Sequence, residues 1–253
     1  MLRVAYSLMF WVFMLVSSMV LFPLAVVIRL ITSAFDPRLR GLHLFTCFWG
    51  SLYTWVNPAW TVRVVGREKL DSNRTTILVA NHLSLLDVLV AFRLFTHFKW
   101  VSKIENFQVP LIGWNMSLNR YIPLRRGAKS STVQMMKQCR ETVAGGNSVM
   151  IFPEGTRSPN GRLRRFRSGA FDLAIDTGTA VQPLIIRGTA DALPKRGFVL
   201  QGRHAISIEV LDVILPEAFA DATGEELTQR ARELIARELG HGDPLQETPI
   251  PLS

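Results

Sequence analysis

Apolar residues dominate the first sixty positions of the chain and fall into two blocks. No formal charge occurs from Val4 to Ile28, and a helix of that length, rising about 1.5 Å per residue, would exceed the ~30 Å hydrocarbon thickness of a bilayer. The second block, Leu42 to Trp60, is rich in Trp and Tyr and is interrupted by Gly50. Aromatic residues of this kind are typical of a membrane interface. Residues 1–60 are therefore predicted to form a membrane-associated two-helix segment.

The charges that flank the first block predict its orientation. Arg29, Arg38 and Arg40 follow it, whereas Arg3 alone precedes it, and the positive-inside bias then places the downstream chain on the cytoplasmic face of the cell membrane. A secretory signal peptide would have a shorter apolar region and a small-residue cleavage site after it. A single span and a helical hairpin seated in one leaflet both remain open.

From residue 61 onward, short β-rich runs alternate with helical stretches. The expected strands are residues 61–66, 75–80, 98–102, 148–153, 180–186 and 206–215, and the expected helices are residues 85–95, 130–144 and 169–176. Alternation of this kind is typical of α/β domains with a parallel sheet. Residues 61–220 are therefore predicted to form an α/β domain with a mixed, largely parallel sheet flanked by helices.

The last part of the chain, residues 221–253, shows the start and stop signals of a helix. Thr223 and Glu226 have the spacing of a capping box, and Gly240 supplies a stop. The tail after Gly240 contains three prolines. This pattern predicts a C-terminal amphipathic helix followed by a disordered end.

Composition narrows the class of partner. The formal net charge of +9 favours polyanionic partners, and a hydrophobic content of 48% is more typical of membrane-associated proteins than of nucleic-acid binders. We therefore expect membrane lipids and no nucleic acid as partners. Cys47 and Cys139 have no metal-binding or redox spacing, and no metal site is predicted.

A polar interruption follows the expected strand at residues 75–80. Ser84 and Asp87 have the spacing of a helix N-cap and its third residue, which places His82 in the turn before the helix. On one continuous helix, His82 and Asp87 would point about 140° apart. With His82 ahead of the helix, the carboxylate can reach back to the imidazole and fix its tautomer, as a general base requires.

The spacing alone is weak evidence for a catalytic pair. With five histidines, a His and an Asp five residues apart occur by chance in about a quarter of such chains. His204 and Glu209 show the same separation, but we expect them on a strand, where residues i and i+5 point to opposite faces. His43, His97 and His241 are expected to be structural or surface residues.

A second polar unit follows the apolar run that ends at Phe152. In the sequence PEGTRS, Gly155 permits close backbone approach, Thr156 and Ser158 offer hydroxyls, and Arg157 suits a bidentate phosphate contact. Four arginines then surround Phe166 in the run GRLRRFRSG. Alone, each unit could be a solvated surface loop; together they favour binding of an anionic headgroup or acyl donor.

Two of these units carry a resemblance to a known family. NHLSLLD (81–87) resembles the NHxxxxD motif, and FPEGTRS (152–158) resembles the second block, of the glycerophospholipid acyltransferases that acylate lysophosphatidic acid. The segments 101–126 and 180–186 are similar to two further blocks, in family order, so the resemblance extends from Gly66 to Pro216. Such an order makes coincidence a minor risk.

The resemblance implies roles for specific residues. His82 would be the general base and Asp87 its orienting partner, while Glu154, Gly155, Thr156 and Arg157 would shape the acceptor site. Lys103 and Arg125 would be further substrate-binding residues. Arg126 directly follows Arg125, and Leu124 replaces the family's acidic residue, so either arginine could meet the phosphate.

The resemblance also implies a reaction without a bound cofactor. An acyl chain would pass from a thioester of acyl carrier protein or coenzyme A, as co-substrate, to the free hydroxyl of lysophosphatidic acid, giving phosphatidic acid. No G-x-S-x-G turn occurs that would indicate an acyl-enzyme. Two alternatives stay open: another acceptor such as a lyso-ornithine lipid, and a non-enzymatic basic adaptor for membranes or nucleic acid.

Overall fold

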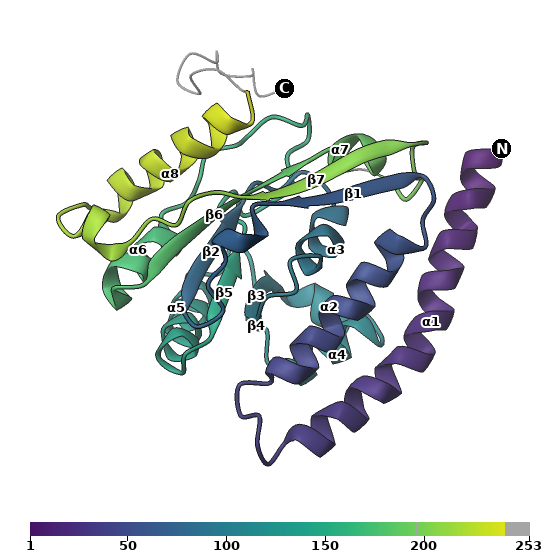
Figure 1. Ribbon diagram of the computed structural model, residues 1–253, viewed down its shortest axis with the longest axis horizontal. Coiled ribbons are helices and arrows are strands. Elements are labelled where there is room, and N and C mark those ends of the chain that lie inside the picture. The colour runs from purple at the N-terminus through teal and green to yellow at the C-terminus, as the bar shows by residue number, and fades with distance from the viewer. Residues whose placement is uncertain (196, 241–253) are drawn as a thin grey trace.

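Seven strands form one sheet in the order β1-β7-β6-β2-β5-β3-β4 (Figure 1). The structure, a computed structural model, describes residues 1–195 and 197–240. The strands are β1 (Trp60–Val65), β2 (Thr76–Ala80), β3 (Phe98–Lys103), β4 (Ile122–Leu124), β5 (Ser148–Ile151), β6 (Ala180–Arg187) and β7 (His204–Val210). Neighbouring strands are parallel except β6 and β7, which are antiparallel. The prediction of a mixed, largely parallel sheet is confirmed.

Strand β2 lies in the middle of the sheet, between β5 and β6, and pairs in parallel with both. Ile77 lies opposite Val149 of β5 and opposite Val181 of β6. Because parallel strands end at the same edge of a sheet, the residues that follow β2 and β5 meet there. This arrangement places His82 and Glu154 in one neighbourhood.

Helices cover both faces of the sheet. They are α1 (Leu2–Thr32), α2 (Arg40–Trp55), α3 (Leu86–Phe92), α4 (Ile112–Leu118), α5 (Lys129–Ala144), α6 (Gly169–Thr177), α7 (Thr189–Ala192) and α8 (Gly224–Glu238), with three short 3₁₀ helices at Arg67–Lys69, Ile104–Gln108 and Pro216–Phe219. Alternate residues of β2 point to opposite faces. Leu78 and Ala80 join the core beneath α1, α2 and α3, whereas Ile77 and Val79 join the core beneath α5, α6 and α8 (Figure 1).

Helices α1 and α2 belong to the same hydrophobic core as the sheet. Phe10 and Leu21 of α1 are buried with Trp49 and Tyr53 of α2 in the cluster that includes Leu78. The Tyr53 hydroxyl accepts a hydrogen bond from Trp49 Nε1 at 2.6 Å and lies 3.1 Å from both Ser17 Oγ and Ser18 Oγ. The two N-terminal helices are thus packed onto the α/β unit.

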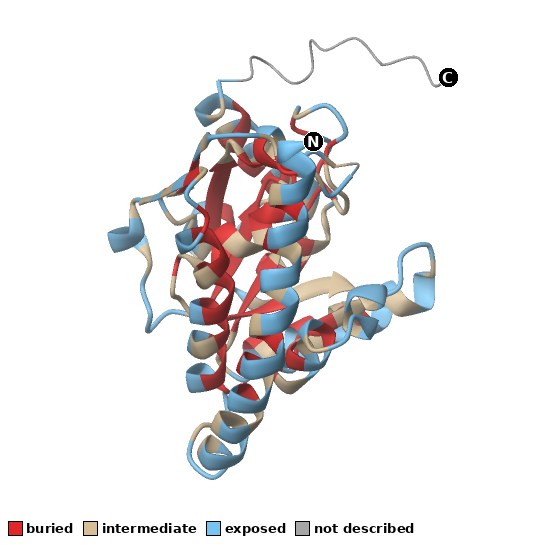
Figure 2. Cartoon of the chain, turned by 90° about the vertical axis from the view of Figure 1, so that its right-hand side faces the viewer, coloured by how far each residue is buried: buried red, intermediate tan, exposed pale blue. Residues whose placement is uncertain are grey.

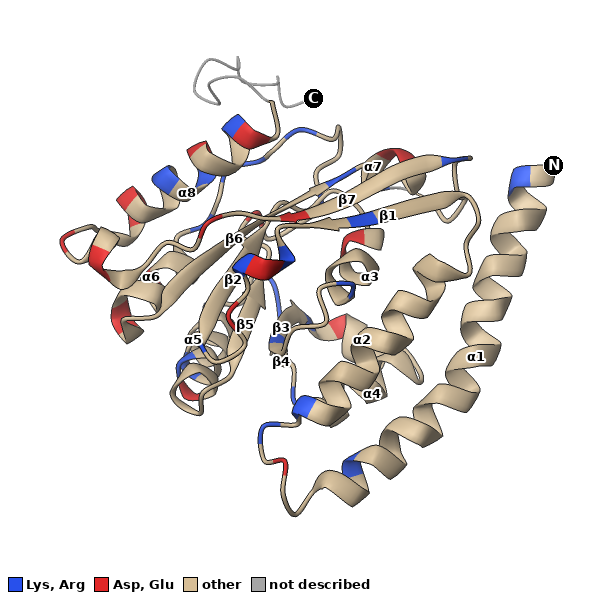
Figure 3. Cartoon of the chain, viewed as in Figure 1, with Lys and Arg blue, Asp and Glu red and all other residues tan. Residues whose placement is uncertain are grey.

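The outer side of α1 is apolar and exposed. Figure 2 shows exposed and buried residues alternating along this helix, and Leu8, Leu15 and Met19 are 63%, 52% and 56% exposed. In Figure 3 the helix carries basic residues only near its ends. Within the described residues, α1 is the one helix long and apolar enough to cross a membrane. Its placement in a membrane, and the division at residues 60 and 220, remain predictions.

Several element boundaries differ from the expectations. Helix α3 ends at Phe92, short of Phe95, whose φ of 49° lies in the left-handed region and cannot continue a helix. The expected strand at residues 206–215 ends at Val210, and beyond it Ile214 forms an isolated bridge with Val181. Elements α4, β4 and α7 were not predicted, because each is short and has no clear periodicity.

At the C-terminal end, the capping box is confirmed. Thr223 Oγ1 accepts from Glu226 N, and Glu226 Oε2 accepts from Thr223 N at 2.8 Å, at the start of α8. The tail that we expected to be disordered, with His241, lies outside the described residues.

Candidate active site

The site begins where β2 ends. All five residues of β2 are buried, and the next residue, Asn81, is fully buried as well. Its side chain donates to Ile186 O and accepts from Ile186 N, both at 2.8 Å. Because both amide groups of Asn81 are held by β6, the chain leaves the sheet in a fixed direction at His82.

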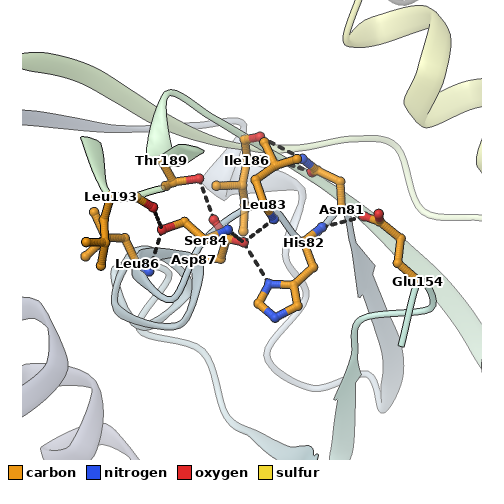
Figure 4. A network of polar contacts seen from close by, with 10 residues as sticks. All are labelled: Asn81, His82, Leu83, Ser84, Leu86, Asp87, Glu154, Ile186, Thr189 and Leu193. Atoms are coloured by element: carbon orange, nitrogen blue, oxygen red, sulfur yellow. Dashed lines mark hydrogen bonds and ion pairs between the residues drawn. The ribbon is translucent and has the colours of Figure 1, made fainter. Parts of the chain in front are cut away.

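The expected pairing of His82 with Asp87 is present. His82 Nδ1 lies 2.8 Å from Asp87 Oδ2; His82 lies in the turn before α3 and Asp87 in the first turn of that helix (Figure 4). A carboxylate can only accept, so Nδ1 carries the proton and Nε2 keeps its lone pair. Nε2 has no hydrogen bond to the described part of the chain and is the atom that can accept a proton from a substrate.

Four donors hold the Asp87 carboxylate, which is fully buried. Besides His82, Oδ2 accepts from the backbone N–H of Leu83 at 2.6 Å and of Ser84 at 2.8 Å. Oδ1 accepts from the hydroxyl of Thr189 at 2.5 Å (Figure 4). These four contacts fix the position of the carboxylate beside the imidazole.

The start of α3 explains how Asp87 reaches back. Helix α3 begins at Leu86 with Leu85 at its N-cap, so Ser84, which we expected as the N-cap, lies one position ahead of the observed cap. Ser84 Oγ still accepts from Leu86 N at 3.2 Å and donates to Leu193 O at 2.6 Å. Together with the Ser84 N–H bond to Asp87, these contacts turn the carboxylate of the first helical turn toward His82.

The His82 ring is packed on one side. It stacks on Phe152 with ring centroids 4.0 Å apart and an interplanar angle of 8°. Its side chain is 13% exposed, so one edge of the imidazole remains accessible. Phe152 follows β5 and is the first residue of the second motif. Its contact with His82 was not predicted, because an apolar residue at a strand end usually belongs to the core.

Glu154 connects the two motifs. Its Oε1 accepts from His82 N at 2.6 Å (Figure 4). Its Oε2 accepts from Arg164 N at 3.1 Å. The residue is 3% exposed. Burial raises the pKa of Glu154 to about 7, although the two backbone donors lower it. In this structure both carboxylate oxygens are occupied by the protein, so Glu154 fixes the loops around His82.

The rest of the second motif also contacts the His82 turn. Ser158 N donates to His82 O at 2.8 Å. Gly155 has φ 69°, and a Cβ there would lie 2.9 Å from Arg167 Nε. Glycine is therefore required for both the backbone conformation and the approach of Arg167. Thr156 and Arg157 are partly exposed beside this turn.

Arginines gather near the second motif. Burial lowers the pKa of Arg126, and Arg167 and Arg157 lower it further, so both of these guanidinium groups lie within electrostatic range of Arg126. Arg125 N is bonded to Ser131 Oγ at 2.9 Å. The choice of Arg125 over Arg126 as a phosphate ligand stays a prediction, and the electrostatic coupling to Arg157 favours Arg126. Such a cluster suits a phosphate group.

Lys103 and the arginine run lie at the margins of this site. Lys103 ends β3 opposite Leu124 and forms an ion pair with Glu105 at 3.0 Å. In the run GRLRRFRSG, Leu163 and Phe166 are buried anchors, while the arginines alternate with them at the surface. The run thus lies over the core between the second motif and α6.

The other histidines have structural surroundings. His204 begins β7, and Glu209 of the same strand pairs with Arg187 at 2.7 Å, so the two are not partners, as expected. His43 is buried between Tyr121 and Thr96, with Nδ1 2.8 Å from the Tyr121 hydroxyl. His97 Nε2 lies 2.9 Å from Asn147 Oδ1.

Within the described residues, both cysteines are buried and no cluster of metal ligands is present. Cys47 and Cys139 are buried, and burial raises the pKa of the Cys139 thiol to about 12, so it stays protonated. The described residues contain no group of three or more His, Cys, Asp and Glu that could hold a metal ion. Thr189, like Phe152, is a site residue that sequence reasoning missed, because nothing in the spacing links it to Asp87.

Comparison with known proteins gives one family. Residues 61–187 match the acyltransferase family model. The chain is 36% identical over 209 residues to the chloroplastic 1-acyl-sn-glycerol-3-phosphate acyltransferase LPAT1 of Arabidopsis thaliana, with 81% of this chain and 56% of that protein covered. It is 33% identical over 237 residues to a 1-acyl-sn-glycerol-3-phosphate acyltransferase of Chlamydomonas reinhardtii, covering 92% and 69% respectively.

A solved structure shares the fold. The crystal structure of the 1-acyl-sn-glycerophosphate acyltransferase PlsC from Thermotoga maritima superimposes with a TM-score of 0.75 at 21% identity, over 98% of this chain and all of that one. This chain spans between about half and two thirds of the length of the two relatives named above. The matched region contains the His82, Asp87 and Glu154 turns, and the chain belongs to the acyltransferase family.

Proposed function

We propose that the protein transfers a fatty acyl chain from an acyl thioester to the free hydroxyl of lysophosphatidic acid, forming phosphatidic acid. The observation that carries the proposal is the Asp87–His82 pair with an open Nε2, next to the coupled arginines Arg126, Arg157 and Arg167. The Asp87–His82 pair supplies a base for the acceptor hydroxyl, and the arginines supply positive charge for the acceptor phosphate. The names of the relatives support the same acceptor.

The reaction follows from the protonation state of His82. Nε2 removes the proton of the acceptor hydroxyl while that oxygen attacks the carbonyl carbon of the thioester. The carbon–sulfur bond then breaks, and the imidazolium returns the proton to the departing thiolate. Asp87 stabilises the transient imidazolium and holds its orientation, so His82 ends neutral with the same tautomer.

Both substrates of this reaction are amphiphiles, so the site should operate at a membrane surface. The exposed apolar side of α1 supplies a surface for lipid contact, and the charge asymmetry around it favours the cytoplasmic face. The packing of the inner side of α1 against α2 favours a helix pair seated in one leaflet, because a free span would have lipid on all sides. Acyl carrier protein and coenzyme A are both suitable thioester carriers.

A transfer assay on the purified full chain tests the proposal. Lysophosphatidic acid, lysophosphatidylcholine and a lyso-ornithine lipid are each offered with acyl carrier protein and coenzyme A thioesters. We expect the highest kcat/KM with lysophosphatidic acid, and Arg157→Ala should lower it for this acceptor by about tenfold or more, since a charge-assisted contact contributes about 1.5–3 kcal/mol. The phosphate-free lyso-ornithine lipid should be little affected by this substitution.

Two results would contradict the proposal. Equal turnover of all three acceptors, with the same loss in Arg157→Ala, would show that no acceptor phosphate is recognised there. Absence of acyl transfer with every donor and acceptor, together with salt-sensitive nucleic-acid binding, would instead support a non-enzymatic adaptor.

A further inference from the structure

A polar cavity of about 340 Å³ opens at the opposite end of the sheet from His82. Lys99 at the start of β3, Tyr121 just before β4 and Asn147 just before β5 line it. Because β3, β4 and β5 run parallel, their amino ends meet at this edge, whereas His82 follows the carboxyl end of β2. The cavity therefore has no residue in common with the candidate active site.

The wall of this cavity contains a buried lysine. Lys99 is 4% exposed, and its Nζ donates to Arg38 O and Asn119 O, both at 2.9 Å. No carboxylate of the described residues lies within ion-pair distance of Nζ. An ammonium has three N–H donors, so one is left for a ligand. Burial without a carboxylate in ion-pair distance disfavours the charged form of Lys99, and a bound anion would stabilise that form.

The rim adds further positive charge. Arg38 and Arg120 line the cavity and are exposed, and Figure 3 shows basic residues around the connection between α1 and α2. Burial lowers the pKa of Lys99 to about 7, and Arg120 and Arg29 lower it further, while Asp36 raises it. A local excess of cations therefore surrounds Lys99.

The acidic groups nearby already have partners. Asp36 Oδ2 accepts from Gly41 N at 2.8 Å, at the start of α2. Glu141 is the acidic residue of the cavity lining, and its Oε1 lies 3.9 Å from Lys137 Nζ. Neither carboxylate is an ion-pair partner of Lys99.

Two residues of this cavity have a strained backbone. Leu39 and Arg120 have φ of 59° and 55°, in the left-handed region that residues other than glycine rarely adopt. Gly146 leaves space for the Arg38 guanidinium at the rim of the cavity, since a Cβ at this glycine would lie 2.6 Å from Arg38 Nη2. Strain of this kind persists where the surrounding structure requires it and often marks a binding site.

We propose that this cavity binds the phosphate group of an anionic lipid, separately from the acyl-transfer site. The apolar surface that leads to it favours a lipid over a free anion: Ile31 is 66% and Phe35 is 72% exposed, and Phe35 is two residues before Pro37 of the cavity wall. A lipid could thus place its chains along the end of α1 and its phosphate between Arg38, Lys99 and Arg120. Basic and apolar groups combined in this way are typical of headgroup recognition.

The thermal unfolding midpoint of the detergent-solubilised full chain tests this. The probe is dihexanoyl phosphatidylglycerol, and dihexanoyl phosphatidylcholine and inorganic phosphate are the comparison ligands. We expect phosphatidylglycerol to raise Tm by several degrees, because a ligand that binds the folded state stabilises it. The double variant Arg38→Gln, Arg120→Asn should lose this rise; asparagine is chosen because it tolerates a positive φ.

Controls separate this cavity from other sites. Arg237→Gln, an exposed position at the end of α8, removes charge far from the α1–α2 connection and should keep the rise (Figure 1). Arg157→Ala should also keep it, which excludes binding at the candidate active site as its source. The double variant should retain its acyl-transfer rate on short-chain acceptor in detergent.

Three outcomes would overturn the inference. A full rise in the double variant would place binding elsewhere. An equal rise with phosphatidylcholine would show that a negative charge is not recognised, and a full rise with inorganic phosphate alone would show that the site takes a free anion and no lipid.

Discussion

At the scale of single residues, the site depends on how completely Asp87 is fixed. Its Oδ2 accepts hydrogen bonds from the His82 ring and from the backbone N–H groups of Leu83 and Ser84, and its Oδ1 accepts one from the Thr189 hydroxyl. The three contacts to Oδ2 come from residues within five positions of Asp87, so the motif spacing predicts them. The Thr189 contact joins residues 102 positions apart and depends on the β2–β6 pairing, which no local pattern shows.

Thr189 is therefore expected to be a positioning residue. Thr189→Val removes the donor to Asp87 Oδ1 and should lower kcat by about tenfold or more, because a buried carboxylate that loses a hydrogen bond costs about 1.5–3 kcal/mol. The KM for the acceptor should change little, since Thr189 contacts no substrate in the proposed mechanism. Thr189→Ser keeps the hydroxyl and should restore most of kcat. If valine and serine variants had the same rate, the contact would not support catalysis.

Glu154 gives a pH prediction for stability. Its pKa is about 7 in the folded protein against 4.5 in the unfolded chain. Between these values the folded state binds more protons, so the free energy of unfolding falls as pH rises from about 4.5 to 7. Glu154→Gln lacks this titration. The stability of the wild-type protein minus that of the variant should therefore drop by about 3 kcal/mol across this range.

Urea unfolding of both proteins in detergent at several pH values measures this difference. His97 also makes stability depend on pH between about 4 and 6.5, since burial lowers its pKa from 6.5 to about 4, but it is present in both proteins and cancels. A difference that stays constant with pH would show that the Glu154 carboxylate is already ionised well below pH 7.

At the scale of elements, the predictable parts are those with strong periodicity. The fully buried strand β2 and the capping box of α8 were expected within one or two residues. The three-residue strand β4 was missed, because it is set by pairing of Val101 with Ile122 and of Lys103 with Leu124, which only the tertiary fold brings about. Arg125 and Arg126 follow this strand, which is why sequence alone left their roles open.

The contact between α2 and α3 depends on Gly50. A Cβ at this position would lie 2.4 Å from Phe92 Cδ2, inside the buried core. Gly50→Ala should therefore lower the free energy of unfolding by about 1–3 kcal/mol through overpacking, despite a gain in helix propensity of about 1 kcal/mol. Urea denaturation measures the change.

Gly41→Ala, in the same helix, is the matched control. Its Cβ would meet Asp36 Oδ2 at 3.5 Å and Thr32 Cγ2 at 3.9 Å, which are ordinary contacts. This variant should be as stable as the wild-type protein or more stable. Equal effects of the two alanines would show that the Phe92 ring moves aside without cost.

At the scale of the whole molecule, α1 has two different sides. One side joins the core of the α/β unit, and the other exposes Leu8, Leu15 and Met19. The apolar run predicts a membrane helix from composition alone, but not that one side of the helix packs onto the domain. That packing arises from contacts with distant segments, such as Trp11 Nε1 with Phe198 O at 2.7 Å.

The exposed side of α1 is expected to bind the bilayer and so to bring the active site close to an acceptor embedded in it. Leu8→Lys combined with Leu15→Lys, seven positions apart on one helical face, should reduce turnover of acceptor embedded in vesicles by about tenfold or more, because charges are costly in the hydrocarbon layer. Turnover of a monomeric short-chain acceptor should be unchanged. The assay compares both acceptors for each protein.

Val133→Lys on α5 is the control, since Val133 is 70% exposed and lies on the other face of the sheet. It should not affect either acceptor. If the α1 variant used embedded acceptor as well as the wild-type protein does, this side of α1 would not be the membrane contact.

The central claim is that His82 is the base of an acyl transfer. The most direct measurement is the steady-state transfer rate of folded His82→Ala with lysophosphatidic acid and an acyl thioester, beside the matched variant His204→Ala. His204 also precedes an acidic residue by five positions but has no carboxylate partner in its strand. We predict loss of at least about a hundredfold in kcat for His82→Ala, the usual contribution of a general base, and a near wild-type rate for His204→Ala. A rate for His82→Ala within a fewfold of wild type, with the fold confirmed by circular dichroism, would contradict the account.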